Sequence, residues 1–365
     1  MPCSIKKLVN PDILAIELYQ PGKPIQEVQQ ELGLKDIIKL ASNENPLGPS
    51  PLVTQAIQKH LQDIHYYPDA GAHDLKKALA NHLNVSPNSI IVGNGSENVL
   101  AMISHTFIKP NDEIIISKHA FATFTIIAHE SHGKPVYIPE NNWRHDLKAT
   151  LKACNQHTKL IYIANPGNPI GTYNTDEELR ELLTSVPEHT IVVLDEAYYE
   201  YVNEKDYPNT LKLMESFPNL IVTRTFSKLY GLAGLRIGYG IARPEIIELL
   251  NRVRLPFNVS SIAQIAAIKA LEDQDYVEAS LTINREGMKQ MQDELKNFGL
   301  KYIPSVTNFM TIKVPENGLS LYKKLLNAGI IVRPLVSYQL PDYIRVTIGT
   351  QTQNERFLKA LAHLI

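Results

Sequence analysis

Short β-branched apolar runs alternate with stretches of helical periodicity between residues 50 and 250, and this alternation constrains the fold more than any other feature of the chain. It is typical of βαβ units, in which parallel strands are joined by helices. The strands that we expect are Ile90–Val92, Glu113–Ser117, Lys159–Ala164, Ile191–Leu194 and Leu220–Thr225. The sequence therefore predicts an α/β fold with a mainly parallel sheet flanked by helices.

Two helix starts in this region can be recognised from their caps. Ser50 followed by Pro51 is an N-cap and first-turn pair. The acidic run at 176–178 places carboxylates where the positive end of a helix dipole favours them.

The pattern changes after about residue 250, where long helical stretches at 263–271 and 276–298 precede strand-like segments at 309–314, 330–333 and 343–348. We therefore expect a large domain over residues 42–255. Residues 256–365 would form a smaller α+β domain, against which, or against another subunit, the N-terminal segment 1–41 would pack. A length of 365 residues agrees with two domains.

Composition narrows the function classes. The formal net charge of −2 gives no sign of a nucleic-acid or polybasic membrane surface. Cys3 and Cys154, the two cysteines, argue against a disulfide framework or a cysteine-built metal site. No apolar run approaches the ~18 residues of a membrane span, and the N-terminus lacks the apolar segment of a signal peptide. We expect a cytoplasmic protein without metal that acts on small molecules.

Four polar motifs follow four of the predicted strands. They are the segment Gly93 to Ser96, NPGNPIGT from Asn165, DEAYYE from Asp195, and TFSK from Thr225 to Lys228. Ligands of open α/β sheets bind in the crevice beyond the carboxyl ends of the strands. The four motifs together therefore predict one site.

Two of these motifs are suited to holding a cofactor but are also ordinary turns. Ser96 opens a helix, so the N–H groups of Gly95, Ser96 and Glu97 could cradle a phosphate; the alternative is a simple N-cap. The prolines around Asn168 could hold its amide in the crevice, or merely form a rigid turn.

The other two motifs carry charge. Asp195 ends an apolar strand, so it either caps a helix or needs a cationic partner such as a protonated pyridine nitrogen. Lys228 leaves a buried strand, where a depressed pKa would make it a nucleophile toward an aldehyde; otherwise it is a solvated loop lysine. Arg236 is either a surface residue or a bidentate ligand of a phosphate.

The combination NPGNPIGT, DEAYYE and SKLYGLAGLRIGYG resembles the fold-type I, aspartate-aminotransferase-like enzymes that depend on pyridoxal 5′-phosphate (PLP), whose large domain has a mainly parallel seven-stranded sheet. Within them the chain is similar to histidinol-phosphate aminotransferases. The motifs that carry this narrower resemblance are YQPGKP, SNENP, FATF, PFNVSS and IVRP. The resemblance extends through nearly the whole chain.

The resemblance implies a role for each cofactor-binding position. Lys228 would hold PLP as a Schiff base and move the substrate proton, while Asp195 would pair with the pyridinium nitrogen. The residues that would contact the ring and its phenolic oxygen are Phe121, Asn168 and Tyr198. Those that would hold the phosphate are Gly95, Ser96, Glu97, Thr225, Ser227 and Arg236. Tyr67 would reach across to the phosphate of the partner subunit in a homodimer; Tyr66 is the alternative, and Tyr67 is preferred because it directly precedes Pro68, as in the family pattern.

The substrate residues are also implied by the resemblance. They are Arg345, Arg333, Tyr19, Asn43 and Asn308. Arginine forks suit carboxylate and phosphate alike, although surface or interface salt bridges are the alternative for both arginines. The chain departs from the wider group at Phe121, where Tyr or Trp is common. It departs again at Gly167 and Ile170, because the commoner sequence of this motif is NPNNPTG.

The expected reaction moves an amino group between L-histidinol phosphate and 2-oxoglutarate in histidine biosynthesis, giving imidazole-acetol phosphate and glutamate. An aromatic amino-acid aminotransferase and a threonine-phosphate decarboxylase are alternatives on the same scaffold. A catalytically silent PLP-binding regulatory module is an alternative of a different class, opposed by the presence of Lys228 and the arginines. A nicotinamide site is excluded, because the glycines of GLAGLRIGYG do not open a helix after a first strand.

Overall fold

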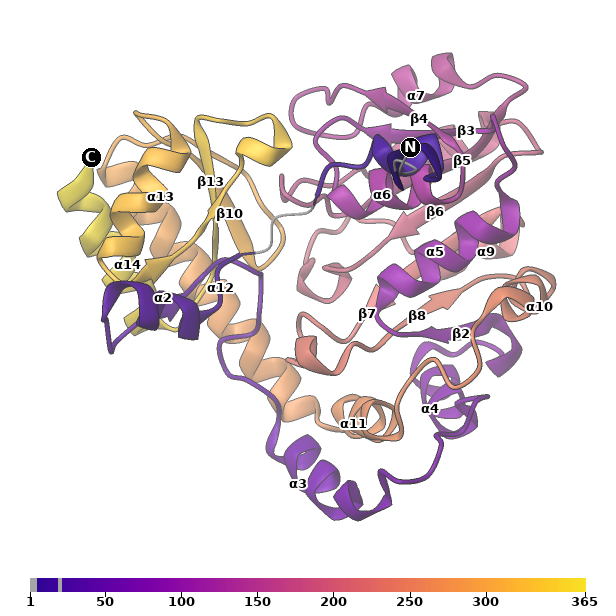
Figure 1. The fold of residues 1–365 in the computed structure, drawn as a ribbon, viewed down its shortest axis with the longest axis horizontal. Helices are drawn as coiled ribbons and strands as arrows, with labels where there is room; N and C mark the ends of the chain where they lie inside the picture. Colours follow the sequence, from indigo (N-terminus) through magenta and orange to yellow (C-terminus); the bar gives the residue numbers. More distant parts are fainter. Residues whose placement is uncertain (1–4, 19–21) are drawn as a thin grey trace.

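The computed structural model describes residues 5–18 and 22–365 and shows a larger lobe built on a seven-stranded sheet beside a smaller lobe (Figure 1). The strand order is β2-β8-β7-β6-β5-β3-β4. The strands are β2 (Ile90–Gly93), β3 (Glu113–Ser117), β4 (Lys134–Ile138), β5 (Thr158–Ala164), β6 (Ile191–Asp195), β7 (Leu220–Thr225) and β8 (Gly238–Ile241). Pairing is parallel except around β8, which is antiparallel to both of its neighbours. The predicted α/β class with a mainly parallel sheet is confirmed.

The five predicted strands are β2, β3, β5, β6 and β7, and the sequence reasoning missed β4 and β8. Each of the two missed strands carries residues that weaken a strand pattern. β4 contains Pro135, which an edge strand tolerates, and it lies at the end of the sheet. β8 contains Gly238 and Gly240, where an added Cβ would lie 2.3 Å from the Ser96 nitrogen and 2.7 Å from the Val99 side chain.

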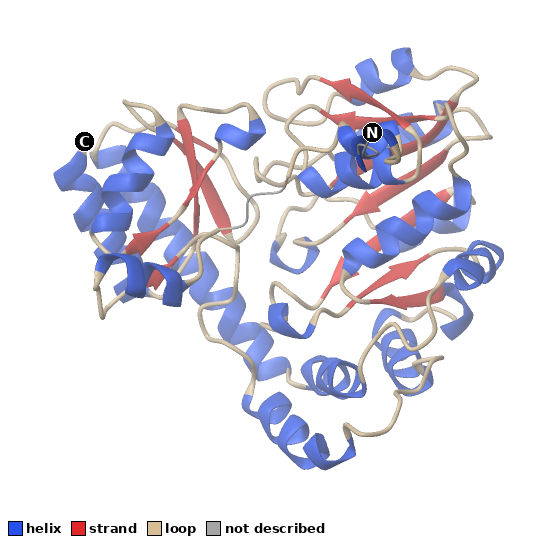
Figure 2. Ribbon diagram, viewed as in Figure 1, coloured by secondary structure: helices blue, strands red, loops and turns tan. Residues whose placement is uncertain are grey.

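Helices cover both faces of this sheet (Figure 2). Neighbouring strand residues alternate between the two cores: Ile161 and Ile163 face one, Leu160 and Tyr162 the other. The first core takes side chains from α3 (Pro51–His60), α4 (His73–Leu83), α7 (Leu147–Ala153), α8 (Asp176–Ser185), α9 (Thr210–Ser216) and α11 (Ser261–Glu272). The second takes them from α5 (Ser96–Phe107), α6 (Ala122–Glu130) and α10 (Pro244–Val253).

Both predicted caps are present. The Ser50 hydroxyl accepts a hydrogen bond from the Val53 N–H at 3.2 Å, with Pro51 in the first turn of α3. Helix α8 begins with the acidic residues 176–178 behind a capping box formed by Thr175 and Glu178.

Helix α11 packs against α3 and α4, although it follows residue 255 in the chain. Its buried residues include four alanines, Ala263, Ala266, Ala267 and Ala270, which allow neighbouring helices to approach closely. The core of the larger lobe therefore extends beyond residue 255. Helix α12 (Gln274–Asn297) then runs from α11 into the smaller lobe (Figure 1).

The smaller lobe contains a four-stranded antiparallel sheet in the order β12-β13-β10-β9. Its elements are β9 (Tyr302–Ile303), β10 (Phe309–Lys313), β12 (Arg333–Pro334), β13 (Tyr343–Thr347), α13 (Gly318–Asn327) and α14 (Gln351–Leu364). The single strand predicted at 330–333 is wrong. Residues Ile330–Ile331 form β11, which pairs with β1 (Ile38–Lys39), and the chain then changes sheet to form β12.

The N-terminal segment contacts both lobes. Helix α2 (Ile25–Leu32) packs on the smaller lobe, where Val28 joins a core with Leu326 and Ile331. Helix α1 (Pro11–Leu14) lies beside α6, and Asp12 faces His132 at 3.2 Å (Figure 1). The described parts of this segment therefore pack on different lobes, α1 on the larger one and α2 on the smaller one.

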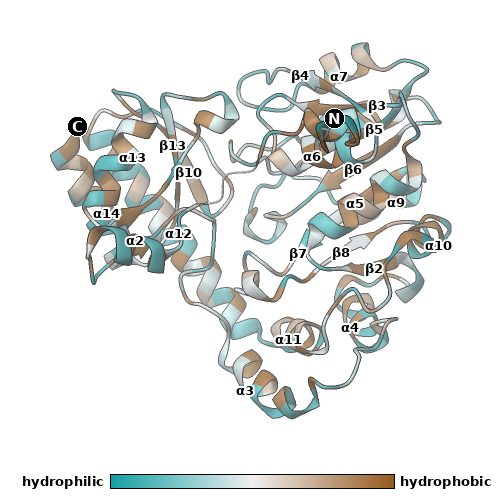
Figure 3. Cartoon of the chain, in the orientation of Figure 1, coloured by the Kyte–Doolittle hydropathy of each residue, from teal (hydrophilic) through white to brown (hydrophobic). Residues whose placement is uncertain are grey.

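The long helices carry hydrophilic as well as hydrophobic residues (Figure 3). In the described part of the chain, no helix is both long and apolar enough to cross a membrane.

Candidate active site

A cavity of about 190 Å³ lies where the carboxyl ends of the sheet strands face the smaller lobe. Most of the predicted site residues line it: Asn43, Ser96, Glu97, Phe121, Asn168, Asp195, Tyr198, Thr225, Ser227, Lys228, Arg236, Arg333 and Arg345. The four strand-end motifs therefore converge on one place, as predicted from the topology of parallel sheets.

One end of the cavity is suited to a phosphate group. Helix α5 begins there at Ser96, and the first N–H groups of a helix have no partner within the helix. Gly95 has φ 80°, and an added Cβ would lie 2.6 Å from Nη2 of Arg236. Glycine at this position is therefore what allows the guanidinium to lie against the helix start.

Arg236 is held by hydrogen bonds on both sides. Its Nη1 donates to the Ser227 hydroxyl at 3.4 Å and to the Ala233 carbonyl at 3.2 Å, while Nη2 pairs with Glu97 at 3.3 Å. The Thr225 hydroxyl lies next to this group and accepts a hydrogen bond from the Ser227 N–H at 3.1 Å. A guanidinium, two hydroxyls and a helix N-terminus together form a donor set that fits a phosphate dianion.

Lys228 follows β7 and reaches toward the cavity. Its Nζ donates to the Ser42 carbonyl at 3.1 Å and lies 5.7 Å from the centre of the Tyr198 ring. Burial, with a further contribution from the positive charges of Arg345 and Arg236, lowers the pKa of Lys228 to about 8. A substantial fraction of the amine is therefore neutral near physiological pH and able to act as a nucleophile.

Asp195 is the last residue of β6 and is 7% exposed. The Thr223 hydroxyl donates to its Oδ1 at 2.9 Å, but a neutral hydroxyl does not balance a buried negative charge. Burial raises the pKa of Asp195 to about 7, against the opposing effect of that hydrogen bond. Because a cationic ring nitrogen would supply the missing charge, the side chain fits a protonated pyridine.

A network of amides and hydroxyls surrounds Tyr198. Its phenolic oxygen accepts a hydrogen bond from Nδ2 of Asn43 at 2.8 Å, and burial raises the pKa of Tyr198 to about 12. Asn308 does not line the cavity; its amide donates to the Asn43 carbonyl at 3.0 Å. Asn43 has φ 56° and donates its backbone N–H to the Thr347 hydroxyl at 2.9 Å. Asn308 therefore contacts the site through Asn43.

The two predicted substrate arginines are 6% and 7% exposed, so neither forms a surface salt bridge. Arg345 lies opposite Arg333 on the paired strands β13 and β12. Its Nη1 donates to Oδ1 of Asn168 at 2.5 Å and its Nη2 to the Ala41 carbonyl at 2.8 Å. Its Nε is buried without a hydrogen-bond partner among the described residues. Arg345 and Arg333 both line the cavity, where an anion would meet their positive charges.

Phe121 is the N-cap residue of α6 and is part of the cavity wall. The loop before it is anchored by Glu140, which accepts from the His119 N–H at 2.8 Å and pairs with the His119 ring at 2.5 Å. The hydrogen bonds from His119 lower the pKa of Glu140 against the effect of its burial.

Of the predicted residues that the structure describes, Gly95, Asn308 and Tyr67 are not in the lining of the cavity. Tyr67 is 81% exposed and stacks on Phe257 with ring centroids 4.6 Å apart. Tyr19 lies outside the described residues. Conversely, Ser42 and Tyr338 line the cavity and were not predicted. Ser42 stands within the SNENP motif, which could have identified it, whereas no local pattern marks Tyr338.

The family model described as Aminotransferase class I and II matches residues 35–361. Histidinol-phosphate aminotransferase 1 of Nitrosococcus oceani is 48% identical over 343 residues, which are 94% of this chain and 93% of that protein. The histidinol-phosphate aminotransferase of Moorella thermoacetica is 46% identical over 97% of this chain and 92% of its own length. The crystal structure of the Sinorhizobium meliloti histidinol-phosphate aminotransferase in complex with pyridoxal-5′-phosphate superposes with a TM-score of 0.89 at 31% identity, covering 98% of this chain and 97% of that one.

Proposed function

Because this chain belongs to the class I and II aminotransferases and, within them, to the histidinol-phosphate aminotransferases, we propose that it transfers the amino group of L-histidinol phosphate to 2-oxoglutarate. The products would be imidazole-acetol phosphate and L-glutamate, and the pathway histidine biosynthesis. The chain is thus a PLP-dependent transaminase.

The observation that carries the proposal is the pairing of two oppositely shifted groups in one cavity. Burial lowers the pKa of Lys228 to about 8 and raises that of Asp195 to about 7. An amine that is partly neutral and a buried acid that lacks a counter-charge are what PLP requires at its aldehyde and at its ring nitrogen. The phosphate-binding donors around Arg236 lie in the wall of the same cavity.

PLP, when bound, supplies the carbonyl that takes up the substrate amine and the ring that accepts electrons from the substrate carbon. The residues of the chain orient the groups and move the proton. Nζ of Lys228 would accept the proton from the substrate carbon and would then donate it to C4′ of the cofactor. Asp195 would keep the ring nitrogen protonated, while Asn168 and Tyr198 would direct hydrogen bonds to the phenolic oxygen. Phe121 would cover one face of the ring.

Arg345 and Arg333 would bind the anionic ends of both substrates. A guanidinium fork accepts a carboxylate or a phosphate with similar geometry, so the same two residues can serve both half-reactions. Both arginines line the cavity, which is what this role requires. Asn43 and Asn308 would support this end of the site, and Tyr19 is proposed to join them.

The active unit is proposed to be a homodimer in the cytoplasm. Tyr66, Tyr67, Leu255 and Phe257 form an apolar patch whose members are 44–81% exposed in the single chain. Tyr67 and Phe257 stack within it. A second copy would cover this patch and bring Tyr67 to the partner's cofactor phosphate. A PLP-binding domain at 42–255 and a small domain of 1–41 and 256–365 are likewise part of the proposal, with the difference that α11 (Ser261–Glu272) packs in the core of the larger lobe.

An absorbance spectrum of the PLP-loaded protein tests the function. L-histidinol phosphate should convert the band of bound pyridoxal phosphate into that of pyridoxamine phosphate, and 2-oxoglutarate should restore it. Phenylalanine, tyrosine and threonine phosphate are the comparison amines. A faster response to an aromatic amino acid would indicate the aromatic aminotransferase alternative, and carbon dioxide release from threonine phosphate would indicate the decarboxylase. No band after PLP addition would refute the role of Lys228.

A further inference from the structure

Trp143 stands in a backbone conformation that its side chain disfavours. Asn141 and Arg144 exchange two backbone hydrogen bonds, at 2.9 and 3.0 Å, around a loop of two residues. Those two residues, Asn142 and Trp143, have φ of 50° and 64°. A two-residue loop with both φ values positive favours Asn-Gly, so tryptophan at the second position is strained. Backbone strain of this kind is retained where the surrounding structure holds it, often for function.

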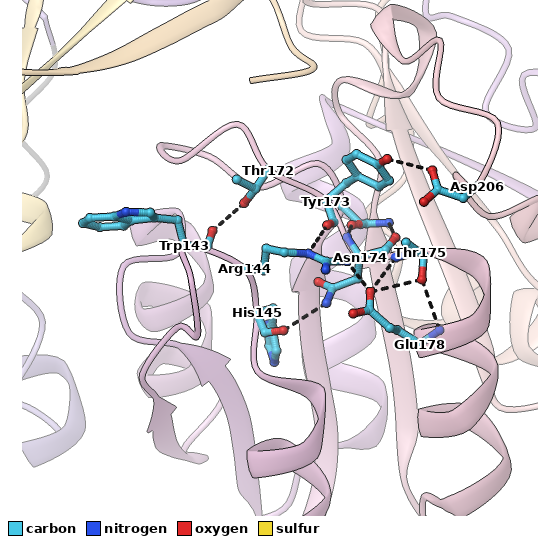
Figure 4. Close-up of polar contacts among 10 residues, drawn as sticks. Trp143, Arg144, His145, Thr172, Tyr173, Asn174, Thr175, Glu178 and Asp206 are labelled. Atoms are coloured by element: carbon cyan, nitrogen blue, oxygen red, sulfur yellow. Dashed lines mark hydrogen bonds and ion pairs between the residues drawn. The ribbon is translucent and has the colours of Figure 1, made fainter. Parts of the chain in front are cut away.

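Polar contacts fasten the strained turn to the chain segment that follows Asn168 (Figure 4). The Trp143 carbonyl accepts from the Thr172 hydroxyl at 2.5 Å, and Nε of Arg144 donates to the Tyr173 carbonyl at 2.7 Å. Arg144 also forms an ion pair with Glu178 in the first turn of α8. The backbone of the turn therefore belongs firmly to the larger lobe.

The ring of Trp143 points away from these polar contacts, toward the smaller lobe (Figure 4). It lies edge-on to Tyr343, with centroids 5.5 Å apart and planes at 64°. Both rings pack on an apolar cluster of Ile170, Ile303, Leu335, Tyr338 and Leu340. We call this cluster, together with Trp143 and Tyr343, the seam between the lobes. Ile170 stands at one of the positions where the chain departs from NPNNPTG, and its apolar side chain packs in the seam.

Two backbone groups of the Asn168 turn also reach the smaller lobe beside the seam. The Pro169 carbonyl accepts from the Thr311 hydroxyl at 2.5 Å, and the Gly171 carbonyl accepts from the Val306 N–H at 3.0 Å. The two lobes are thus joined here by hydrogen bonds as well as by apolar packing.

The seam is continuous with the residues proposed to bind substrate anions. Tyr343 begins β13, and Arg345 lies two residues further on, so both side chains leave the same face of the strand. Arg333 is opposite Arg345, and Tyr338 of the seam lines the cavity. By contrast, Lys228, Asp195 and the donors around Arg236 belong to the larger lobe.

We propose that Trp143, with Ile170, is a positioning residue that sets the spacing of the two lobes where Arg345 and Arg333 face the cavity. It thereby sets the affinity for anionic substrates without touching them. This inference rests on the proposed function of the two arginines. Substrate affinity should respond more strongly than cofactor affinity, because the seam adjoins the arginines and lies apart from Lys228, Asp195 and the phosphate-binding donors around Arg236.

The test is Trp143→Gly in the PLP-loaded enzyme. Glycine adopts positive φ without strain, so the turn should form at least as well while the ring is lost. Isothermal titration with glutarate, a dicarboxylate that has neither an amino nor a keto group, should show a Kd raised roughly tenfold, equivalent to about 1.4 kcal/mol. The KM for 2-oxoglutarate should rise by a similar factor, whereas the Kd for PLP should stay within roughly twofold.

Two further variants and a control make the result specific. Trp143→Phe keeps an aromatic ring against Tyr343 and should restore most of the glutarate affinity. Ile170 is the other residue of the seam that belongs to the larger lobe, so Ile170→Thr should also raise the Kd for glutarate. Phe298→Ala removes a partly buried aromatic residue from the core of the smaller lobe, away from the seam, and should leave glutarate affinity unchanged.

An unchanged glutarate Kd in Trp143→Gly overturns the proposal. A PLP Kd that rises as much as the glutarate Kd also overturns it, because the lobes would then have loosened generally. Failure of the wild-type enzyme to transaminate would instead refute the proposed function. An active wild-type enzyme with an unaffected Trp143→Gly variant refutes only the role of the seam.

Discussion

Replacing Asp195 by asparagine should stabilise the protein without its cofactor while destroying its activity. Burial raises the pKa of this carboxyl from 3.8 to about 7, so its ionised form is strongly disfavoured in the folded chain. At about 1.4 kcal/mol for each pH unit, the difference corresponds to about 4 kcal/mol. The asparagine side chain would remain an acceptor for the Thr223 hydroxyl but would bring a buried amide whose hydrogen-bonding cost is about 1–3 kcal/mol. The expected net gain is about 1–3 kcal/mol at pH 8.

The sign of the pH dependence follows from proton binding. Between pH 4 and pH 7 the folded wild-type chain holds a proton at Asp195 that the unfolded chain has released. The contribution of Asp195 to the free energy of unfolding of the wild type therefore falls as the pH rises from 4 to 7, and it stays low above pH 7. The advantage of Asp195→Asn should shrink by about 2–3 kcal/mol between pH 8 and pH 5.

Urea unfolding of the PLP-free proteins at pH 8 and pH 5 measures both quantities. Glu204→Gln, at an exposed acid in the loop after Tyr201, is the matched control and should show no such pH-dependent gain. Addition of PLP should stabilise the wild type more than the variant, and transamination by the variant should fall roughly 10²-fold or more. A variant that is less stable at pH 8, or whose stability difference is the same at both pH values, would refute the reasoning.

Three further predictions concern the cofactor and the assembly. Lys228→Ala should abolish turnover and the absorbance band of bound pyridoxal phosphate, while equilibrium dialysis still detects some PLP; retained turnover would contradict the assignment. Gly95→Ala should raise the Kd for PLP by roughly tenfold or more, because the new Cβ would lie 2.6 Å from Arg236 at φ 80°; an unchanged fluorescence titration would exclude the phosphate site there. Leu255→Asp, at a residue 72% exposed in the single chain, should convert a dimer to monomers in light scattering, and no change in mass would remove this patch from the interface.

The higher free energy of unfolding expected for Asp195→Asn illustrates that the active-site residues destabilise the cofactor-free fold. Lys228 and Asp195 are both held where their charged forms are poorly solvated. Such groups lower the stability of the free chain, and the bound cofactor offsets that loss.

Local sequence was sufficient to predict five of the seven strands of the large sheet and the polar groups that follow four of them. Hydrophobic periodicity is a property of neighbouring residues, and the topology of parallel strands then places their carboxyl ends together. Asn168, Asp195 and Lys228 were therefore predicted to meet, and they line one cavity. Strands β4 and β8 were not predicted because proline and glycine weaken the sequence pattern of a strand. In the folded chain, the edge position of β4 accommodates its proline, and the close packing of a helix on β8 requires its glycines.

Tertiary structure alone decided how the lobes meet. Arg345 lies 177 residues beyond Asn168, yet the two are hydrogen-bonded, and Trp143 reaches Tyr343 across a similar separation. The break between β11 and β12 likewise depends on which distant strand each one pairs with. No local pattern encodes such contacts, because they exist only when the whole chain has folded. The sequence determined which chemical groups the site contains, and the packing of one lobe on the other decided their spacing.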